Sequence, residues 1–212
     1  MYGTPSNLFL GFHGCDRAVG EKILAGKSGL KESRNKYDWL GFGRYFWEGD
    51  YGRAVEWSNW LAKRKIPPRI EEPFVIGAII DLGHCLNLLE TENLRALQDG
   101  YEELVGLCRE AGKPIPENKP LRGGSDLLLR HLDCAVLETV HRLVEEAGRP
   151  AYDSVRGVFW GGKELYPHAG FRSHNHIQIC VRNPNCIKGY FRPLKPSRGY
   201  RVPSKINQYA EV

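Results

Sequence analysis

A long hydrophobic run is missing from this chain of 212 residues. Its apolar stretches fall short of the roughly 18 residues that a helix needs to cross a bilayer. The first residues also lack the basic segment and the longer apolar segment that together mark a signal peptide. We therefore expect a cytoplasmic protein that acts without a membrane.

Closely spaced cysteine pairs are missing as well. The six cysteines are scattered and none forms a Cys-x-x-Cys pair, which argues against a zinc site. His168, His174 and His176 are near one another in sequence, but the first two belong to an irregular stretch without an evident Cys or carboxylate partner. Zinc needs several convergent ligands, so we expect no metal. The thiols are expected to be reduced and mostly buried.

The composition is that of an ordinary globular protein. Hydrophobic residues make up 42% and charged residues 26% of the chain. The length suits one domain over residues 1–212. Lysine and arginine number 30 against 25 for aspartate and glutamate, a net charge of +5. This mild excess is compatible with an anionic ligand or a nucleic acid and establishes neither.

Strand and helix patterns occupy the first part of the chain. Residues 8–13 predict a strand, and residues 17–25 a short helix. The near-continuous apolar run of residues 74–82 predicts a buried strand. Over residues 51–65, apolar side chains recur at helical spacing, which predicts a helix with a core-facing stripe. The residues of this stripe are Ala54, Trp57, Trp60 and Leu61.

The middle of the chain, over about residues 88–150, predicts a helical insertion within the domain. Its helices are expected over residues 93–111 and 125–147, separated by a proline-rich break. Ser125 and Asp126 are the expected cap of the second helix.

Strands are expected again after the insertion. They cover residues 153–160 and 176–182, with a long loop between them. Asn183-Pro184-Asn185 predicts a turn, so that residues 186–191 return as the second strand of a hairpin. A basic surface tail is expected over about residues 192–212.

A glycine motif, Gly41-x-Gly43-x-Tyr45-Phe46, precedes the predicted helix of residues 51–65. Two glycines one residue apart allow a tight turn and the close approach of a ligand. The aromatic residues that follow favour a strand, and an exposed ring there would stack on a flat ligand. Taken alone, the pattern also fits an ordinary strand after a turn.

Two further pieces surround this motif in the chain. His13-Gly14 ends the first strand and places an imidazole at the rim of a sheet. The late strand that begins at His176 carries Gln178 two residues on, and strand alternation puts both side chains on one face.

Together, these pieces resemble the ADP-ribosyltransferase superfamily, in particular the diphtheria-toxin and poly(ADP-ribose) polymerase branch in its bacterial or phage type. Its members carry a His-Gly-Ser/Thr strand, a Gly-x-Gly-x-Tyr-Phe strand and a glutamate or a substitute for it on a late strand. The resemblance covers about residues 6–62 and 153–192. It implies an α+β fold, in which a split antiparallel β-sheet forms a crevice for NAD, the substrate.

The resemblance also implies roles for single residues. The catalytic set would be His13, Tyr45 and Gln178. His13 would hydrogen-bond a ribose, Tyr45 would stack on nicotinamide, and Gln178 would hold the ribose 2′-hydroxyl. The residues expected to contact NAD are His13, Gly14, Gly43, Tyr45, Phe46 and Arg53. Cleavage of the nicotinamide–ribose bond develops positive charge on the sugar, which a nearby ring and oxygen atoms stabilise.

The chain departs from the family pattern at several of these positions. Gln178 stands where glutamate is usual, and an amide can bind a ribose hydroxyl but carries no negative charge. This favours a single transfer over chain elongation. Glu164, in the preceding loop, is the alternative source of a carboxylate. Arg53 replaces a serine of the polymerases and suits the pyrophosphate of NAD, and Cys15 replaces the Ser or Thr after His-Gly.

The loop before the late strand combines aromatic and basic residues. Trp160 and Arg172, together with His176, are the residues expected to recognise the acceptor. Bases stack on aromatic rings and phosphates pair with arginine, so a nucleic-acid acceptor is as open as a protein one.

The leading hypothesis is an NAD-dependent mono-ADP-ribosyltransferase, toxin-like or defence-related, that modifies a protein or nucleic acid. Such an enzyme allows for a cognate antitoxin or inhibitor. The alternatives are an NAD glycohydrolase, with water as the acceptor, and an inactive module that binds NAD, ADP-ribose or nucleic acid. The RNA 2′-phosphotransferase branch is disfavoured, because no cluster of basic residues and histidines fits it.

Overall fold

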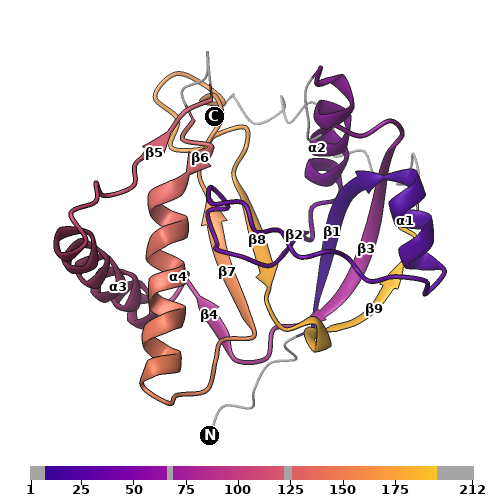
Figure 1. Ribbon diagram of the computed structural model, residues 1–212. Coiled ribbons are helices and arrows are strands. Elements are labelled where there is room, and N and C mark those ends of the chain that lie inside the picture. Colours follow the sequence, from indigo (N-terminus) through magenta and orange to yellow (C-terminus); the bar gives the residue numbers. More distant parts are fainter. Residues whose placement is uncertain (1–7, 66–68, 122–125, 195–212) are drawn as a thin grey trace, which may run out of the picture.

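The fold is built on one sheet of seven strands (Figure 1). The computed structural model describes residues 8–65, 69–121 and 126–194. The strands of the sheet are β1 (Leu8–Asp16), β2 (Arg44–Glu48), β3 (Pro73–Asp81), β4 (Cys85–Asn87), β7 (Ser154–Phe159), β8 (His176–Val181) and β9 (Ile187–Phe191). The helices are α1 (Arg17–Leu24), α2 (Tyr51–Lys63), α3 (Thr91–Glu110) and α4 (His131–Glu146). A separate short pair consists of β5 (Asn118–Lys119) and β6 (Leu129–Arg130).

The class is α+β, as predicted, but the sheet is mixed rather than antiparallel throughout. Its strand order is β4-β7-β8-β2-β1-β3-β9. β4 and β7 run parallel, whereas the other neighbouring strands are antiparallel. The chain between β4 and β7 contains α3 and α4, and a long crossover of this kind lets a strand return in the same direction. The prediction of an antiparallel sheet is therefore wrong at this edge.

A narrow junction joins the two halves of the sheet. β1 and β2 are paired at Gly11 with Glu48 and at Phe12 with Trp47. By contrast, β1 pairs with β3 along its whole length. The half made of β4, β7, β8 and β2 therefore meets the half made of β1, β3 and β9 over a very short backbone ladder.

A largely buried ion pair reinforces this junction. Arg156 of β7 donates from Nε and Nη2 to the carboxylate of Glu48 in β2, at 2.6 and 2.7 Å. Its Nη1 lies 3.4 Å from Oδ1 of Asn87 in β4. The guanidinium carbon also lies 5.4 Å from the ring centre of Phe9 in β1. One side chain thereby connects strands from both halves.

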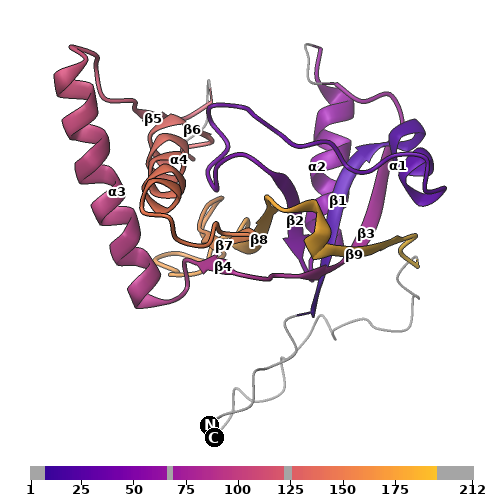
Figure 2. The ribbon, with the colours of Figure 1, turned by 60° about the horizontal axis from the view of Figure 1, so that its bottom comes forward.

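Helices α2 and α4 cover the same face of the sheet. Leu137 of α4 packs with Val155 and Cys180 of the left half in Figure 1. Ala54 of α2 packs against Trp47 at the junction. Trp47 and Cys180 share one face, because the β2–β8 register and strand alternation place them there. Figure 2 shows α4 above β7 and β8, and α2 beyond β2 and β1. None of the helices in the described ranges is long and apolar enough to cross a bilayer.

The predicted hairpin of residues 176–182 and 186–191 is wrong. β9 pairs with β3 at the far edge of the sheet. Both edges of β8 are already occupied, one by β7 and the other by β2. The 3₁₀ turn of Pro184–Cys186 instead redirects the chain across the sheet.

Two tryptophans of α2 are more exposed than predicted. Ala54 and Leu61 are buried, but Trp57 and Trp60 are each 39% exposed. Their rings stack on one another, with centres 4.9 Å apart. A methyl group on Gly14 would overlap the backbone of Ala54. α2 thus approaches the sheet closely through small residues, which leaves its large rings outside.

The second insertion helix begins later than predicted. α4 starts at His131, and Ser125 lies outside the described residues. Asp126 caps no helix but accepts a hydrogen bond from Gly162 N at 2.8 Å. The predicted basic tail also lies outside the described residues from 195 onward.

We expect Glu48→Gln to destabilise the protein by about 1–3 kcal/mol, because the largely buried Arg156 loses its charged partner. Urea unfolding would measure the change. The control is Glu146→Gln, which weakens the pair of Glu146 with Arg142. That pair is 55% and 37% exposed, against 17% and 14% for Glu48 and Arg156, so its loss should cost less than about 1 kcal/mol. Equal losses in the two variants would contradict the bridging role of Arg156.

Candidate functional site

Several of the predicted residues gather on the sheet face between α2 and α4. Gln178 of β8 lies opposite Trp47 of β2, and His176 lies on the same face by alternation. The His176 ring stacks on Phe159, with centres 4.9 Å apart, and its centre is 6.3 Å from that of Trp47. We call Trp39, Trp47, Phe159, His176 and Gln178 the late-strand cluster.

The amide of Gln178 is buried and held in one orientation. Nε1 of Trp39 donates a hydrogen bond to its Oε1 at 2.6 Å. This contact leaves the Nε2 group on the side away from the indole. Arg130, directly before α4, lies over the rings of Trp39 and Phe159 at 5.5 and 5.0 Å. The indole that holds the amide thus carries a cation on its ring.

Arg53 brings a second positive charge to the cluster from the first turn of α2. Its backbone N–H donates to the capping carboxylate of Asp50 at 2.9 Å. Burial lowers the pKa of His176 to about 4, and the nearby charge of Arg53 acts in the same direction. His176 is therefore neutral at neutral pH. A further charged contact of Arg53 is the pair with Glu56.

Two buried donors beside His176 have no hydrogen-bond partner within the described chain. They are Nε of Arg53 and Nε1 of Trp47. Buried donors in proteins are nearly always hydrogen-bonded, to protein or to ordered water, so an oxygen atom of a water or of a ligand would satisfy each of these two. A molecule rich in oxygen atoms and negative charge suits this combination of a guanidinium and an indole.

The structure places the His13 side chain on the opposite face of the sheet. Its ring meets Phe46 edge-on, with centres 6.0 Å apart, and Phe46 alternates with Trp47 along β2. Nδ1 of His13 lies 2.8 Å from the backbone oxygen of Tyr45. Burial lowers the pKa of His13, so the neutral ring donates from Nδ1 to this carbonyl. His13 thereby ties β1 to β2 where their ladder ends.

Tyr45 shares the face of Gln178, but its ring packs into the core beside α4. Its hydroxyl donates to Gly41 O at 2.7 Å and accepts from Leu40 N at 2.9 Å. Burial is the main cause that raises the pKa of Tyr45 well above its usual value. In this arrangement the hydroxyl braces the glycine turn.

Three other residues that were predicted to contact NAD, Gly14, Gly43 and Phe46, lie at closely packed positions. A methyl group on Gly14 would overlap α2, and one on Gly43 would overlap Sγ of Cys180. Phe46 is fully buried in the core on the His13 face. The structure therefore brings Gln178, His176 and Arg53 together and does not bring the His13 and Tyr45 side chains to the same place.

The predicted acceptor residues Trp160 and Arg172 lie together in the long loop. The guanidinium carbon of Arg172 is 3.9 Å from the ring centre of Trp160. Glu164 accepts from His168 N at 3.2 Å and lies 3.9 Å from Nη2 of Arg172. These contacts of Glu164 are all within the loop. Over the described ranges, no group of three or more His, Cys, Asp or Glu side chains is arranged to hold a metal ion.

A cavity of about 350 Å³ lies on the α2 side of the junction, and no residue of the late-strand cluster lines it. Its lining residues are Phe12, Tyr51, Phe191, Arg192, Pro193 and Leu194. Phe12 is the pairing partner of Trp47 across the junction, so the cavity opens on the face that carries Gln178. The His13 side chain lies on the other face.

Sequence reasoning missed three residues that shape the site. Trp39 stands two residues before the glycine motif, and this position was the available sign that it belongs to the site. Arg130 and Glu138 belong to the helical insertion, and nothing in the sequence connected them with the site. Glu138 accepts from Phe42 N at 2.7 Å and from Nη1 of Arg182 at 2.9 Å, which fixes the glycine turn to α4.

Comparison of the chain with protein-family models, with curated proteins and with solved structures gave no match.

Tyr45→Phe should destabilise the protein by about 1–2 kcal/mol, because it removes two hydrogen bonds, leaves Leu40 N unpaired and leaves Gly41 O with only the weak Sγ donor of Cys180. Thermal and urea unfolding would measure the loss. Tyr101→Phe, at an exposed position on α3, is the control and should leave the free energy of unfolding unchanged. A Tyr45→Phe variant as stable as the wild type would show that the hydroxyl does not brace the turn.

Stability should fall as the pH is lowered from 7 to 5. The pKa of His176 is about 4 in the folded chain, against an ordinary 6.5. Between these values the unfolded chain binds the proton and the folded chain does not, so acid favours unfolding. His176→Gln should reduce the loss by on the order of 1 kcal/mol, as measured by urea unfolding at both pH values. An unchanged pH dependence in this variant would contradict the neutral state of His176.

Proposed function

We propose that the protein is an NAD-dependent mono-ADP-ribosyltransferase whose substrate contacts come from the late-strand cluster. The observation that carries the proposal is the oriented amide of Gln178, which Trp39 holds at 2.6 Å on the face shared with Trp47 and His176. An amide fixed in this way is suited to bind a ribose hydroxyl.

NAD has the chemical groups that this environment would accept. The guanidinium of Arg53 suits the pyrophosphate, and its unpartnered Nε supports that assignment. The unpartnered Nε1 of Trp47 would donate to a ribose or phosphate oxygen. A flat nicotinamide ring, cationic before cleavage, would gain from the neighbouring aromatic rings.

In the proposed reaction, the bond between the nicotinamide nitrogen and ribose C1′ breaks, and its electron pair leaves with nicotinamide. A nucleophilic atom of the acceptor forms the new bond to C1′ and loses its proton. Gln178 would hold the 2′-hydroxyl through Nε2 while positive charge develops on the ribose. Because an amide stabilises that charge less than a carboxylate would, the residue favours a single transfer.

His13 and Tyr45 act as positioning residues in this proposal. His13 ties β1 to β2 through the backbone of Tyr45, and the Tyr45 hydroxyl braces the turn that follows Trp39. Both therefore support Gln178 from a distance. A toxin-like or defence-related role, with an antitoxin or inhibitor as partner, belongs to the same proposal.

Labelled NAD, incubated with the protein and with cell protein or RNA, tests the function. We expect label on a macromolecule with the wild type, and a fall in kcat of about 10²-fold or more in Gln178→Ala. Gln178→Glu should keep or raise NAD cleavage, because a carboxylate stabilises the ribose cation better. Glu164→Gln, in the neighbouring loop, is the control and should turn over NAD normally.

Each other outcome selects a different function. Free nicotinamide and ADP-ribose without labelled macromolecule would indicate an NAD glycohydrolase. NAD binding without cleavage would indicate a binding module. A dead Glu164→Gln together with an active Gln178→Ala would overturn the assignment of Gln178.

A further inference from the structure

Exposed aromatic rings are concentrated at one end of the molecule. In the described part of the chain they are Trp57, Trp60, Tyr101, Trp160, Tyr166 and Phe171. All but Tyr101 belong to α2 or to the loop between β7 and β8. Figure 1 shows α2 and this loop at the same end of the sheet, on either side of the start of β8. Gathered exposed rings of this kind usually mark a binding surface.

α2 presents two stacked rings beside a set of cations. Trp57 and Trp60 lie 4.9 Å apart at 25°, and each is 39% exposed. The guanidinium carbon of Arg64 lies 4.9 Å from the Trp60 ring centre, and Lys63 and Lys65 are exposed next to it. Flat cations and nucleobases stack on the same faces of an indole.

The loop repeats this combination on the other side of β8. Trp160 is 55% and Phe171 64% exposed, and Arg172 lies over the Trp160 ring at 3.9 Å. Lys163 is exposed in the same loop. As on α2, exposed rings here lie beside positively charged side chains.

Ring contacts connect the α2 surface to the late-strand cluster. Trp57 lies 6.0 Å from Trp47, whose ring centre is 6.3 Å from that of His176. His176 in turn stacks on Phe159, with ring centres 4.9 Å apart. Phe159 is the last residue of β7, and Trp160 follows it at the start of the loop. A ligand that spans α2 and the loop would therefore pass over the start of β8.

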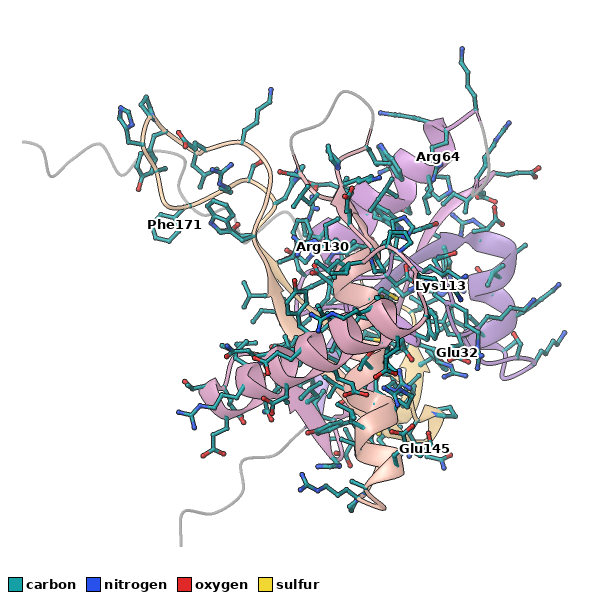
Figure 3. All side chains as sticks on the ribbon, turned by 60° about the vertical axis from the view of Figure 1, so that its left-hand side comes forward. Glu32, Arg64, Lys113, Arg130, Glu145 and Phe171 are labelled. Carbon is teal, nitrogen blue, oxygen red and sulfur yellow. The ribbon has the colours of Figure 1, made fainter. Side chains whose placement is uncertain are left out.

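The charge of this end is suited to phosphates. Figure 3 shows Arg64 and Phe171 in the upper half of the molecule, with Arg130 between them nearer the centre of the view. The acidic residues of this surface include Glu56 and Glu164, each with an arginine as partner, and Asp126, which accepts a hydrogen bond from Gly162 N. The lysines of α2 and the loop add to the positive charge.

We propose that this surface, formed by residues 57–65 and 160–175, binds single-stranded nucleic acid. Unpaired bases would stack on the exposed indole rings, and the phosphates would contact the neighbouring lysines and arginines. A duplex would hide the faces of its bases from these rings, so a single strand fits better. The binding does not depend on NAD. The further assignment of the bound strand as the ADP-ribose acceptor rests on the proposed function.

Fluorescence anisotropy tests the binding without NAD. The probes are a labelled oligouridine RNA of twelve nucleotides, about the length of one such site, and the matching oligothymidine DNA. We expect Trp60→Ala and Trp60→Leu to weaken binding about tenfold or more, while Trp60→Phe keeps most of it. The Leu variant keeps apolar bulk but has no ring. Tyr101→Ala, an exposed aromatic on α3, is the matched control and should bind like the wild type.

Salt dependence gives a second readout. Replacing Lys63 and Lys65 by glutamine should lower the slope of log Kd against log salt by about 0.7 for each phosphate that these lysines neutralise in the wild type. Preference for the RNA or the DNA probe identifies which strand the surface takes. Circular dichroism and thermal unfolding would confirm that each variant is folded.

Two results would overturn the proposal. One is a wild-type protein that binds neither probe. The other is a wild-type affinity for the probes in both Trp60→Ala and Trp160→Ala. NAD cleavage in the absence of an acceptor is measured on the same Trp60 variants. Normal cleavage with weakened nucleic-acid binding supports the surface and leaves the proposed function standing. Intact nucleic-acid binding in a protein that does not use NAD would contradict the proposed function alone.

Discussion

The short pairing between β1 and β2 is the constraint on which the rest of the structure depends. Two residue pairs cannot hold the halves of a sheet rigidly, so side chains supply the remaining connections. Arg156 crosses from β7 to Glu48 and Phe9 at one side of the junction. At the other side, Nδ1 of His13 donates a hydrogen bond to the backbone carbonyl of Tyr45. The histidine and the arginine act together as a side-chain extension of the backbone ladder.

The helical region completes the site instead of standing apart from it. Glu138 of α4 accepts a hydrogen bond from Phe42 N. The Tyr45 hydroxyl of β2 makes two hydrogen bonds to the same turn. This glycine turn positions Trp39, whose indole orients the amide of Gln178. A partly buried polar chain of this kind is most effective when every member is satisfied, so its residues are expected to depend on one another strongly. The amide on β8 is thus controlled by segments that lie far from it in sequence.

The α+β class was predicted from the family resemblance. Local patterns were enough to predict most helices and strands and the shared face of His176 and Gln178, because these follow from periodicity along one segment. The face of His13 could not be predicted in this way, since it depends on the register between β1 and β2. The pairing of β9 with β3 depends on which strand edges are already occupied. The contact of Trp39 with Gln178 joins residues 139 positions apart, and no local signal encodes it.

All five tryptophans of the chain lie at the end of the molecule that carries the late-strand cluster: Trp39, Trp47, Trp57, Trp60 and Trp160. The indole is the principal natural fluorophore of proteins, so nearly all ultraviolet emission of this protein originates from one region. The stacked pair on α2 should also give a coupled near-ultraviolet circular dichroism signal. The molecule therefore carries an intrinsic optical reporter of its own candidate site, and occupancy there can be followed without any added label.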